Sequence, residues 1–114
     1  MDDCLFCKMV SGDIEADIVY QDDQVLAFRD INPQAPVHVL IIPKRHISTL
    51  NELGPRDDRL AGQLLLAAGK VAQMEGIAEQ GYRTLVNCNE YGGQLVFHIH
   101  LHLLGGRRMN WPPG

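Results

Sequence analysis

The stretch of sequence that decides the fold is Phe97-His98-Ile99-His100-Leu101-His102-Leu103-Leu104, in which histidines alternate with aliphatic residues. Successive side chains of an extended chain point to opposite faces, so the three imidazoles should share one face and the aliphatic side chains the other. At about 3.3 Å of rise per residue, the outer two rings would stand roughly 13 Å apart, each roughly 7 Å from the middle one. We therefore expect a strand with one face in the core and the other at a functional site.

Two kinds of site fit such a row of imidazoles. Neutral imidazole is a common metal ligand, and it is also a nucleophile available near pH 7. Three rings spread roughly 13 Å along one strand cannot all reach a metal ion at about 2.1 Å, which argues against a metal centre made of the three histidines alone. A phosphate-sized group above His100, by contrast, could touch both flanking rings.

The length and charge of the chain limit its partners. With 114 residues, the chain suits a single domain spanning residues 1–114. The net charge of -4 argues against general binding to nucleic acid or to a membrane surface, since both are anionic. No apolar run is long enough to cross a bilayer, and Met1-Asp2-Asp3 lacks the pattern of a signal peptide, so we expect a cytoplasmic protein.

The cysteines raise a separate question. Cys4 and Cys7 form a C-x-x-C pair, and the third cysteine, Cys88, cannot complete an even set of disulfides within one chain. In a reducing compartment this spacing is typical of metal binding or redox use, although two ordinary thiols fit it as well. The residues by themselves leave these alternatives open.

Apolar patterns and turn formers predict the shorter elements. Residues 4–11 suit a helical turn that Gly12-Asp13 would end, and residues 47–53 suit a second short helix. Strands are expected at residues 18–20, 25–28, 37–42 and 82–87. The first two would form a hairpin, and 37–42 would be a central strand in which alternation groups His38 with Leu40 and Ile42.

The longest helix is expected to begin at Pro55 and to end at Gly76. Its apolar residues recur at steps of four and three and would form one stripe against a sheet: Leu60, Leu64, Ala67, Val71 and Met74. Residues 88–94 would turn the chain into the histidine strand. Trp111, among prolines in the tail, suggests docking on another surface such as a second subunit.

Several motifs together resemble one known family. His98-Ile99-His100-Leu101-His102-Leu103-Leu104 is similar to the His-x-His-x-His-x-x pattern, with x hydrophobic, that names the histidine-triad (HIT) superfamily. The segments 30–38, 42–47, 92–94, 104–107 and 111–114 resemble the Hint branch, the histidine-triad nucleotide-binding proteins. The resemblance implies an α+β fold: an antiparallel sheet of about five strands with one long and one or two short helices, which dimerises into a continuous sheet with the Trp111 tail near the partner subunit.

The same resemblance implies an activity, the hydrolysis of purine nucleoside phosphoramidates such as AMP or GMP linked to an amine. His100 would be the nucleophile and form a nucleotidyl-histidine, and His98, His102 and His38 would complete the catalytic cluster. No organic cofactor, nucleic acid or membrane is implied.

The resemblance also implies a nucleotide site. Asp30 would accept hydrogen bonds from the ribose hydroxyls. Gly93 belongs to a pair of glycines whose backbone amides can converge on an anion, although a plain hairpin turn explains the pair about as well. The purine would lie among apolar side chains: Leu5, Phe6, Met9, Phe28, Ile31 and Leu40. The phosphate would be contacted by Asn87, Gln94, the backbone amide of Leu95, His100 and His102.

Leu95 is a departure from the family pattern, which commonly has a hydroxyl residue there that assists the leaving group. A leucine side chain cannot donate a proton. We therefore also consider a nucleotide-binding dimeric adaptor with weak turnover. Dinucleoside polyphosphate hydrolases share the triad, but the ending Trp111-Pro112-Pro113-Gly114 favours the Hint branch.

A second family pattern concerns zinc. Some HIT proteins hold a structural zinc ion with C-x-x-C, the histidine of Pro-Lys-x-His and the first histidine of the triad. The matching residues here are Cys4, Cys7, His46 and His98. Two thiolates and two imidazoles suit tetrahedral zinc with no open position, so the ion would be structural and would pin Leu5 and Phe6 to the catalytic strand.

Overall fold

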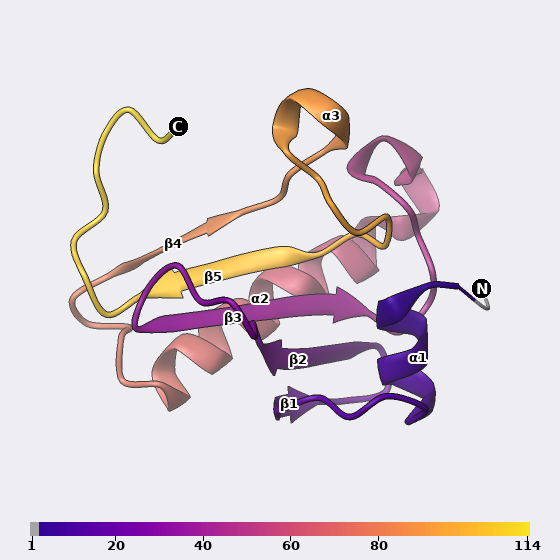
Figure 1. The fold of residues 1–114 in the computed structure, drawn as a ribbon, viewed down its shortest axis with the longest axis horizontal. Coiled ribbons are helices and arrows are strands. Elements are labelled where there is room, and N and C mark those ends of the chain that lie inside the picture. Colours follow the sequence, from indigo (N-terminus) through magenta and orange to yellow (C-terminus); the bar gives the residue numbers. More distant parts are fainter. Residues whose placement is uncertain (1–2) are drawn as a thin grey trace.

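The computed structural model describes residues 3–114, in which a five-stranded antiparallel sheet is covered on one face by a long helix (Figure 1). The strand order is β1-β2-β3-β5-β4, so β3 lies at the centre, as expected for residues 37–42. The strands are β1 Ile18–Gln21, β2 Val25–Arg29, β3 Val37–Pro43, β4 Tyr82–Leu85 and β5 Leu101–Gly105. The helices are α1 Leu5–Ser11, α2 Asp58–Met74 and α3 Asn89–Gly92, with 3-10 turns at Leu50–Glu52 and Pro55–Asp57. The expected α+β architecture is confirmed.

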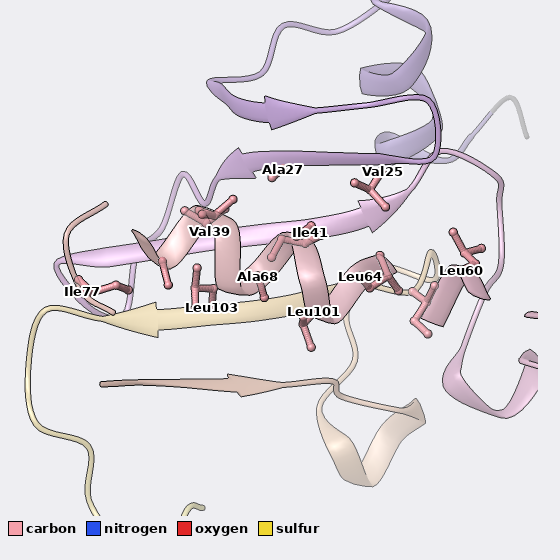
Figure 2. Packing of buried hydrophobic residues seen from close by; sticks show 14 of the residues in the cluster. Val25, Ala27, Val39, Ile41, Leu60, Leu64, Ala68, Ile77, Leu101 and Leu103 are labelled. Carbon is pink, nitrogen blue, oxygen red and sulfur yellow. The ribbon is translucent and has the colours of Figure 1, made fainter. Parts of the chain in front are cut away.

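The main core lies between α2 and the sheet. Leu60, Leu64 and Ala68 of the helix pack against strand residues such as Val39 and Leu103 (Figure 2). Met74 is an exception to the expected stripe, because its side chain is 56% exposed. In the second half of α2 the buried face includes Ala68 and Ala72. Met74 lies two residues beyond Ala72, about 200° around the helix, and therefore points away from the sheet.

The other face of the sheet carries a smaller core beneath α1. Phe6 of α1 packs there on Phe28, with their ring centroids 5.3 Å apart. Leu40 and Ile42 belong to the same cluster, so the expected grouping of alternate β3 residues with His38 is confirmed. The helix α1 ends where predicted, at Gly12, whose φ of +85° suits a residue without a side chain. The sheet therefore has two apolar faces, and the histidines lie on the α1 side.

The expected histidine strand is only partly formed. Strand β5 begins at Leu101, so the expectation that residues 97–100 are also in the strand is wrong. β3 runs on to Pro43, but its pairing with β5 stops at Ile41 and Leu101. Pro43 has no N–H, its carbonyl accepts a hydrogen bond from the ring of His98, and the N–H of Ile99 donates to Ile47 at 2.6 Å. The alternation survives this break, because Ile99, Leu101 and Leu103 are all buried in the core against α2.

Other differences are shorter elements than the sequence suggested. The helix expected at 47–53 is a single 3-10 turn, the strand expected at 82–87 stops at Leu85, and the turn 88–94 contains the one-turn helix α3. Within residues 3–114, no helix combines the length and the apolar composition needed to cross a membrane.

Candidate functional site

A cavity of about 780 Å³ opens on the α1 side of the sheet. Its walls come from α1 and the residues that follow it, from β2 and the loop after it, from β3, and from the segment between β4 and β5 together with β5 itself. Of the residues expected to contact the nucleotide, all but Gln94 line the cavity. The lining residues among them are Leu5, Phe6, Met9, Phe28, Asp30, Ile31, Leu40, Asn87, Gly93, Leu95, His100 and His102. The fold thus brings together residues that are far apart in the sequence.

Gln94 is buried and does not line the cavity. Its side-chain amide donates to the carbonyls of Ser48 and Val96 at 2.8 and 3.0 Å, and its side-chain oxygen accepts from the N–H of Asn89 at 2.9 Å. These bonds engage both ends of the side chain in holding the turn that contains α3. The side chain of Gln94 therefore supports the cavity rather than lining it.

His100 lines the cavity at the point where β5 begins. Its Nδ1 lies 2.9 Å from the carbonyl of His98, and a carbonyl only accepts, so Nδ1 carries the proton. In the neutral ring, the lone pair is then on Nε2. Burial lowers the pKa of His100, which keeps this lone pair free at neutral pH. Phe6 holds the ring edge-on, with centroids 5.2 Å apart.

His38 and His102 form a hydrogen-bonded pair beside His100. The N–H of Gln34 donates to Nδ1 of His38 at 3.0 Å, so in the neutral ring the proton of His38 is on Nε2. That nitrogen lies 2.9 Å from Nδ1 of His102, which must accept. The proton of neutral His102 is consequently on Nε2, a buried atom with no hydrogen-bond partner among residues 3–114.

The three rings around the cavity are all biased toward the neutral form. Burial is the main cause that lowers the pKa of His38 and of His100. Burial, together with the neighbouring His100 and His38, lowers the pKa of His102 to about 4. The ring centroids of His100 and His102 are 4.9 Å apart, closer than the spacing expected for a regular strand. Two adjacent rings therefore line the cavity, one with its lone pair on Nε2 and one with its proton on a buried Nε2.

Asp30 lies near this pair. Its Oδ1 accepts from the N–H of Asn32 at 2.8 Å, and its Oδ2 is 3.5 Å from Nε2 of His38. Asp30, His38 and His102 also offer atoms close enough together to hold a metal ion. His38 does not fit the role of a metal ligand, because the lone pair on its Nδ1 accepts a hydrogen bond from the backbone N–H of Gln34 and its Nε2 carries a proton.

A separate cluster lies where α1 meets the segment before β5. Cys4, Cys7, His46 and His98 each offer a ligand atom within 4.8 Å of the others. Nε2 of His98 is 2.8 Å from the carbonyl of Pro43 and donates to it, so the lone pair on Nδ1 faces the cluster. This cluster combines the residues expected from the family pattern to bind metal.

The spacing within the cluster fits a tetrahedral ion. Nδ1 of His98 lies 3.2 Å from Nδ1 of His46, and 3.3 and 3.5 Å from the sulfur atoms of Cys4 and Cys7. Zinc bonds of about 2.05 Å to nitrogen and 2.3 Å to sulfur would give tetrahedral edges of roughly 3.3 Å and 3.6 Å. The donor set and its spacing are therefore suited to a metal ion.

Comparison with known proteins agrees with this geometry. The family model described as HIT domain matches residues 11–109. The chain belongs to the HIT family. The purine nucleoside phosphoramidase of Escherichia coli strain K12 is 52% identical over 106 residues, which are 93% of this chain and 89% of that protein. An uncharacterised HIT-like protein of Synechococcus elongatus is also 52% identical, over 99% of this chain and 98% of that protein.

Solved HIT structures have the same fold. The crystal structure of a HIT family hydrolase from Legionella pneumophila Philadelphia 1 superposes with a TM-score of 0.96 at 57% identity, covering 98% of this chain and 100% of that one. A HIT family hydrolase from Clostridium thermocellum gives a TM-score of 0.94 at 47% identity, with 96% of each chain covered.

Sequence reasoning missed several residues of this HIT chain. Cavity residues that it did not single out are Glu15, Ala16, Asp17, Arg29, Asn32, Gln34 and Val96. Gln34 matters most among them, since its backbone N–H decides which ring nitrogen of neutral His38 carries the proton. The signal that could have found it is its place in a turn-rich loop, four residues before a histidine that shares a face with the apolar residues of β3.

Proposed function

We propose that the chain hydrolyses the phosphorus–nitrogen bond of purine nucleoside 5'-phosphoramidates through a nucleotidyl intermediate on His100. One observation carries this proposal: Nδ1 of His100 is committed to the His98 carbonyl, and the lone pair on Nε2 belongs to a cavity residue. The 52% identity to a purine nucleoside phosphoramidase supports it.

The reaction would run in two displacements. In the first, Nε2 of His100 bonds to the α-phosphorus, the bond from phosphorus to the amine nitrogen breaks, and the amine leaves with its electron pair and takes up a proton from solvent. In the second, water attacks the same phosphorus and gives up a proton to solvent while the bond to Nε2 breaks with its electron pair returning to the ring, which releases the nucleoside monophosphate and restores His100.

The neighbouring groups would stabilise charge and position the nucleotide. The unpartnered Nε2–H of His102 would donate to a non-bridging phosphate oxygen, and the backbone amide of Leu95 and the side chain of Asn87 would serve the others. Asp30 would accept from the ribose hydroxyls. The purine would lie against the apolar wall that Phe6 and its neighbours form.

The cysteine and histidine cluster would hold a structural zinc ion. Cys4, Cys7, His46 and His98 would supply all four ligands, which leaves no open position for substrate. When bound, zinc would supply a cross-link between α1 and the segment before β5. Since Leu5 and Phe6 lie between the two cysteines, we propose that the ion fixes the purine wall relative to His100.

We also propose a homodimer in which the sheets of two copies join. β4 is an outer strand of the sheet order, and the nearby helix α2 exposes Leu65 and Leu66. The ring of Trp111 is 81% exposed and lies 5.8 Å from the guanidinium of Arg83, a residue of β4. The tail therefore lies beside the edge strand through which a second copy would pair.

A second candidate function is nucleotide binding with weak turnover, as in an adaptor for a partner protein. Leu95 favours it, because this cavity residue is 90% exposed and has no proton to give to a leaving group. The deciding experiment is steady-state hydrolysis of a panel of AMP and GMP phosphoramidates and dinucleoside polyphosphates, with zinc content measured on the same sample. Turnover of the phosphoramidates supports the hydrolase, whereas binding without turnover supports the adaptor.

A further inference from the structure

Gln34 is held at both of its backbone polar groups. Its N–H donates to Nδ1 of His38 at 3.0 Å, and its carbonyl accepts from Nη2 of Arg107 at 3.0 Å. The guanidinium is fixed in turn, since Nη1 donates to the carbonyl of Arg108 at 3.2 Å. Arg107 follows β5 by two residues, so the strand that carries His102 also carries this clamp on the loop before β3.

The end of β5 packs tightly against the same loop. Gly106 has a φ of +87°, and a Cβ placed there would lie 2.8 Å from the Cβ of Pro36. The loop has its own restraints as well: the Gln34 side chain donates to the Asn32 carbonyl at 3.0 Å. From outside the loop, the side chain of Arg107 adds a further restraint by donating a hydrogen bond to the carbonyl of Gln34.

The backbone N–H of Gln34 sets the direction of the hydrogen bonds that run from Gln34 through His38 to His102. Because an N–H only donates, Nδ1 of His38 must keep its lone pair, Nε2 of His38 must donate, and Nε2 of His102 must carry a proton. Without that amide, His38 could adopt its other tautomer. His102 would then donate through Nδ1 and present a lone pair at Nε2, which repels a phosphate oxygen.

We propose that Arg107 is a positioning residue that acts through the Gln34 peptide to hold His38 and His102 in the tautomers that leave a proton on Nε2 of His102. The benefit to catalysis rests on the proposed function, in which that proton serves a phosphate oxygen. The tautomers themselves exist without any substrate, so the two proposals can fail separately.

The direct test is to record the imidazole tautomers by long-range ¹H–¹⁵N NMR in the full chain without substrate. The wild type should show His38 and His102 protonated at Nε2. Arg107→Ala should give a mixture of tautomers at both rings, Arg107→Lys should retain most of the wild-type pattern, and the matched control Arg108→Ala should be indistinguishable from wild type. An unchanged His102 tautomer in Arg107→Ala overturns the proposal.

Kinetics with an AMP phosphoramidate provide a second test. Arg107→Ala should lower kcat about tenfold with KM changed less than about threefold, because the loss is in orientation and not in substrate contacts. The acid limb of its pH profile should move to higher pH, since His38 loses a donor to its lone pair while still facing Asp30, His100 and His102. Arg107→Lys should recover most of the rate.

Two outcomes of this test contradict the proposal. Equal losses in Arg107→Ala and Arg108→Ala would trace the effect to the general loss of positive charge. A lower kcat with an unshifted acid limb and unchanged tautomers would trace it to the packing of the tail. Should Arg107→Ala fold poorly, Arg107→Met keeps the length of the aliphatic stem and replaces it in both experiments. Failure of the wild type to turn over any phosphoramidate contradicts the proposed function alone, because the NMR result still decides the role of Arg107.

Discussion

Nε2 of His38 and Nδ1 of His102 lie 2.9 Å apart, although 64 residues separate them in the sequence. β3 and β5 are antiparallel neighbours with Leu40 opposite His102, which places His38 diagonally across from its partner on the same face of the sheet. Burial lowers the pKa of both rings, so both stay neutral, and the proton on Nε2 of His38 lies in the hydrogen bond to Nδ1 of His102. This state supplies an N–H to the cavity without adding a charge beside the nucleophile.

The first prediction concerns stability at low pH. Folding lowers the pKa of His102 from 6.5 to about 4, so between these values the unfolded chain binds a proton that the folded chain does not. The free energy of unfolding should therefore fall as the pH drops from about 7 to 4, by an amount on the order of 2 kcal/mol from this residue. Urea denaturation at a series of pH values measures the fall.

His102→Gln is the matched variant for this test. It removes the titrating ring, so the fall in stability across this pH window should be smaller than in the wild type by about that amount. Any loss of metal at low pH affects both proteins and cancels in the difference. Parallel curves for the two proteins would show that His102 is not protonated differently in the folded and unfolded chains.

The second prediction separates chemistry from binding at His100. His100→Asn removes the lone pair of Nε2 but keeps a polar side chain at the same place in the cavity wall. The rate of phosphoramidate cleavage should fall at least about 10³-fold, while the Kd for AMP should change less than about threefold. Single-turnover kinetics and calorimetry measure the two quantities. Retained cleavage would exclude His100 as the nucleophile.

The third prediction concerns zinc. Cys4→Ser and Cys7→Ser should lower the zinc content and the Tm, and should weaken AMP binding more than they slow the cleavage of bound substrate, because Phe6 belongs to both α1 and the cavity wall. Cys88→Ser is the control, since this thiol lies outside the cluster and should leave all three quantities unchanged. Metal-stripped protein with wild-type AMP affinity would contradict the proposed link.

The sequence predicted the parts of the fold that depend on local pattern. Alternation correctly assigned Ile99, Leu101 and Leu103 to the core, because the two-residue period of an extended chain persists even where no strand partner is present. The point at which β5 begins depends on where its pairing with β3 stops, at Ile41 and Leu101. That boundary is set by tertiary contacts of Pro43 and Ile99 that neither segment encodes alone.

The protonation of the site was beyond sequence reasoning for a similar cause. The motif predicted that His38, His100 and His102 meet, and the cavity contains all three. Which nitrogen of each ring carries the proton depends on single backbone groups, the Gln34 amide and the His98 carbonyl, whose positions follow from loop conformation. The environment of Gln94 was hidden for the same reason, because only the folded turn reveals that both ends of its side-chain amide are hydrogen-bonded.

The last prediction concerns the leaving group. Leu95 lines the cavity, and because it is 90% exposed its side chain packs little against the rest of the protein. Leu95→Ser should therefore leave the free energy of unfolding within about 0.5 kcal/mol of the wild-type value. The new hydroxyl should raise the rate for phosphoramidates of alkyl amines, whose nitrogen must gain a proton to leave, by about three- to tenfold. Substrates whose leaving group departs as a stable anion, such as an acyl phosphate of AMP, should gain little. Leu95→Ala controls for side-chain size. If both substrate classes gain equally, or if Leu95→Ala gives the same gain as Leu95→Ser, the higher rate does not come from proton donation by the new hydroxyl.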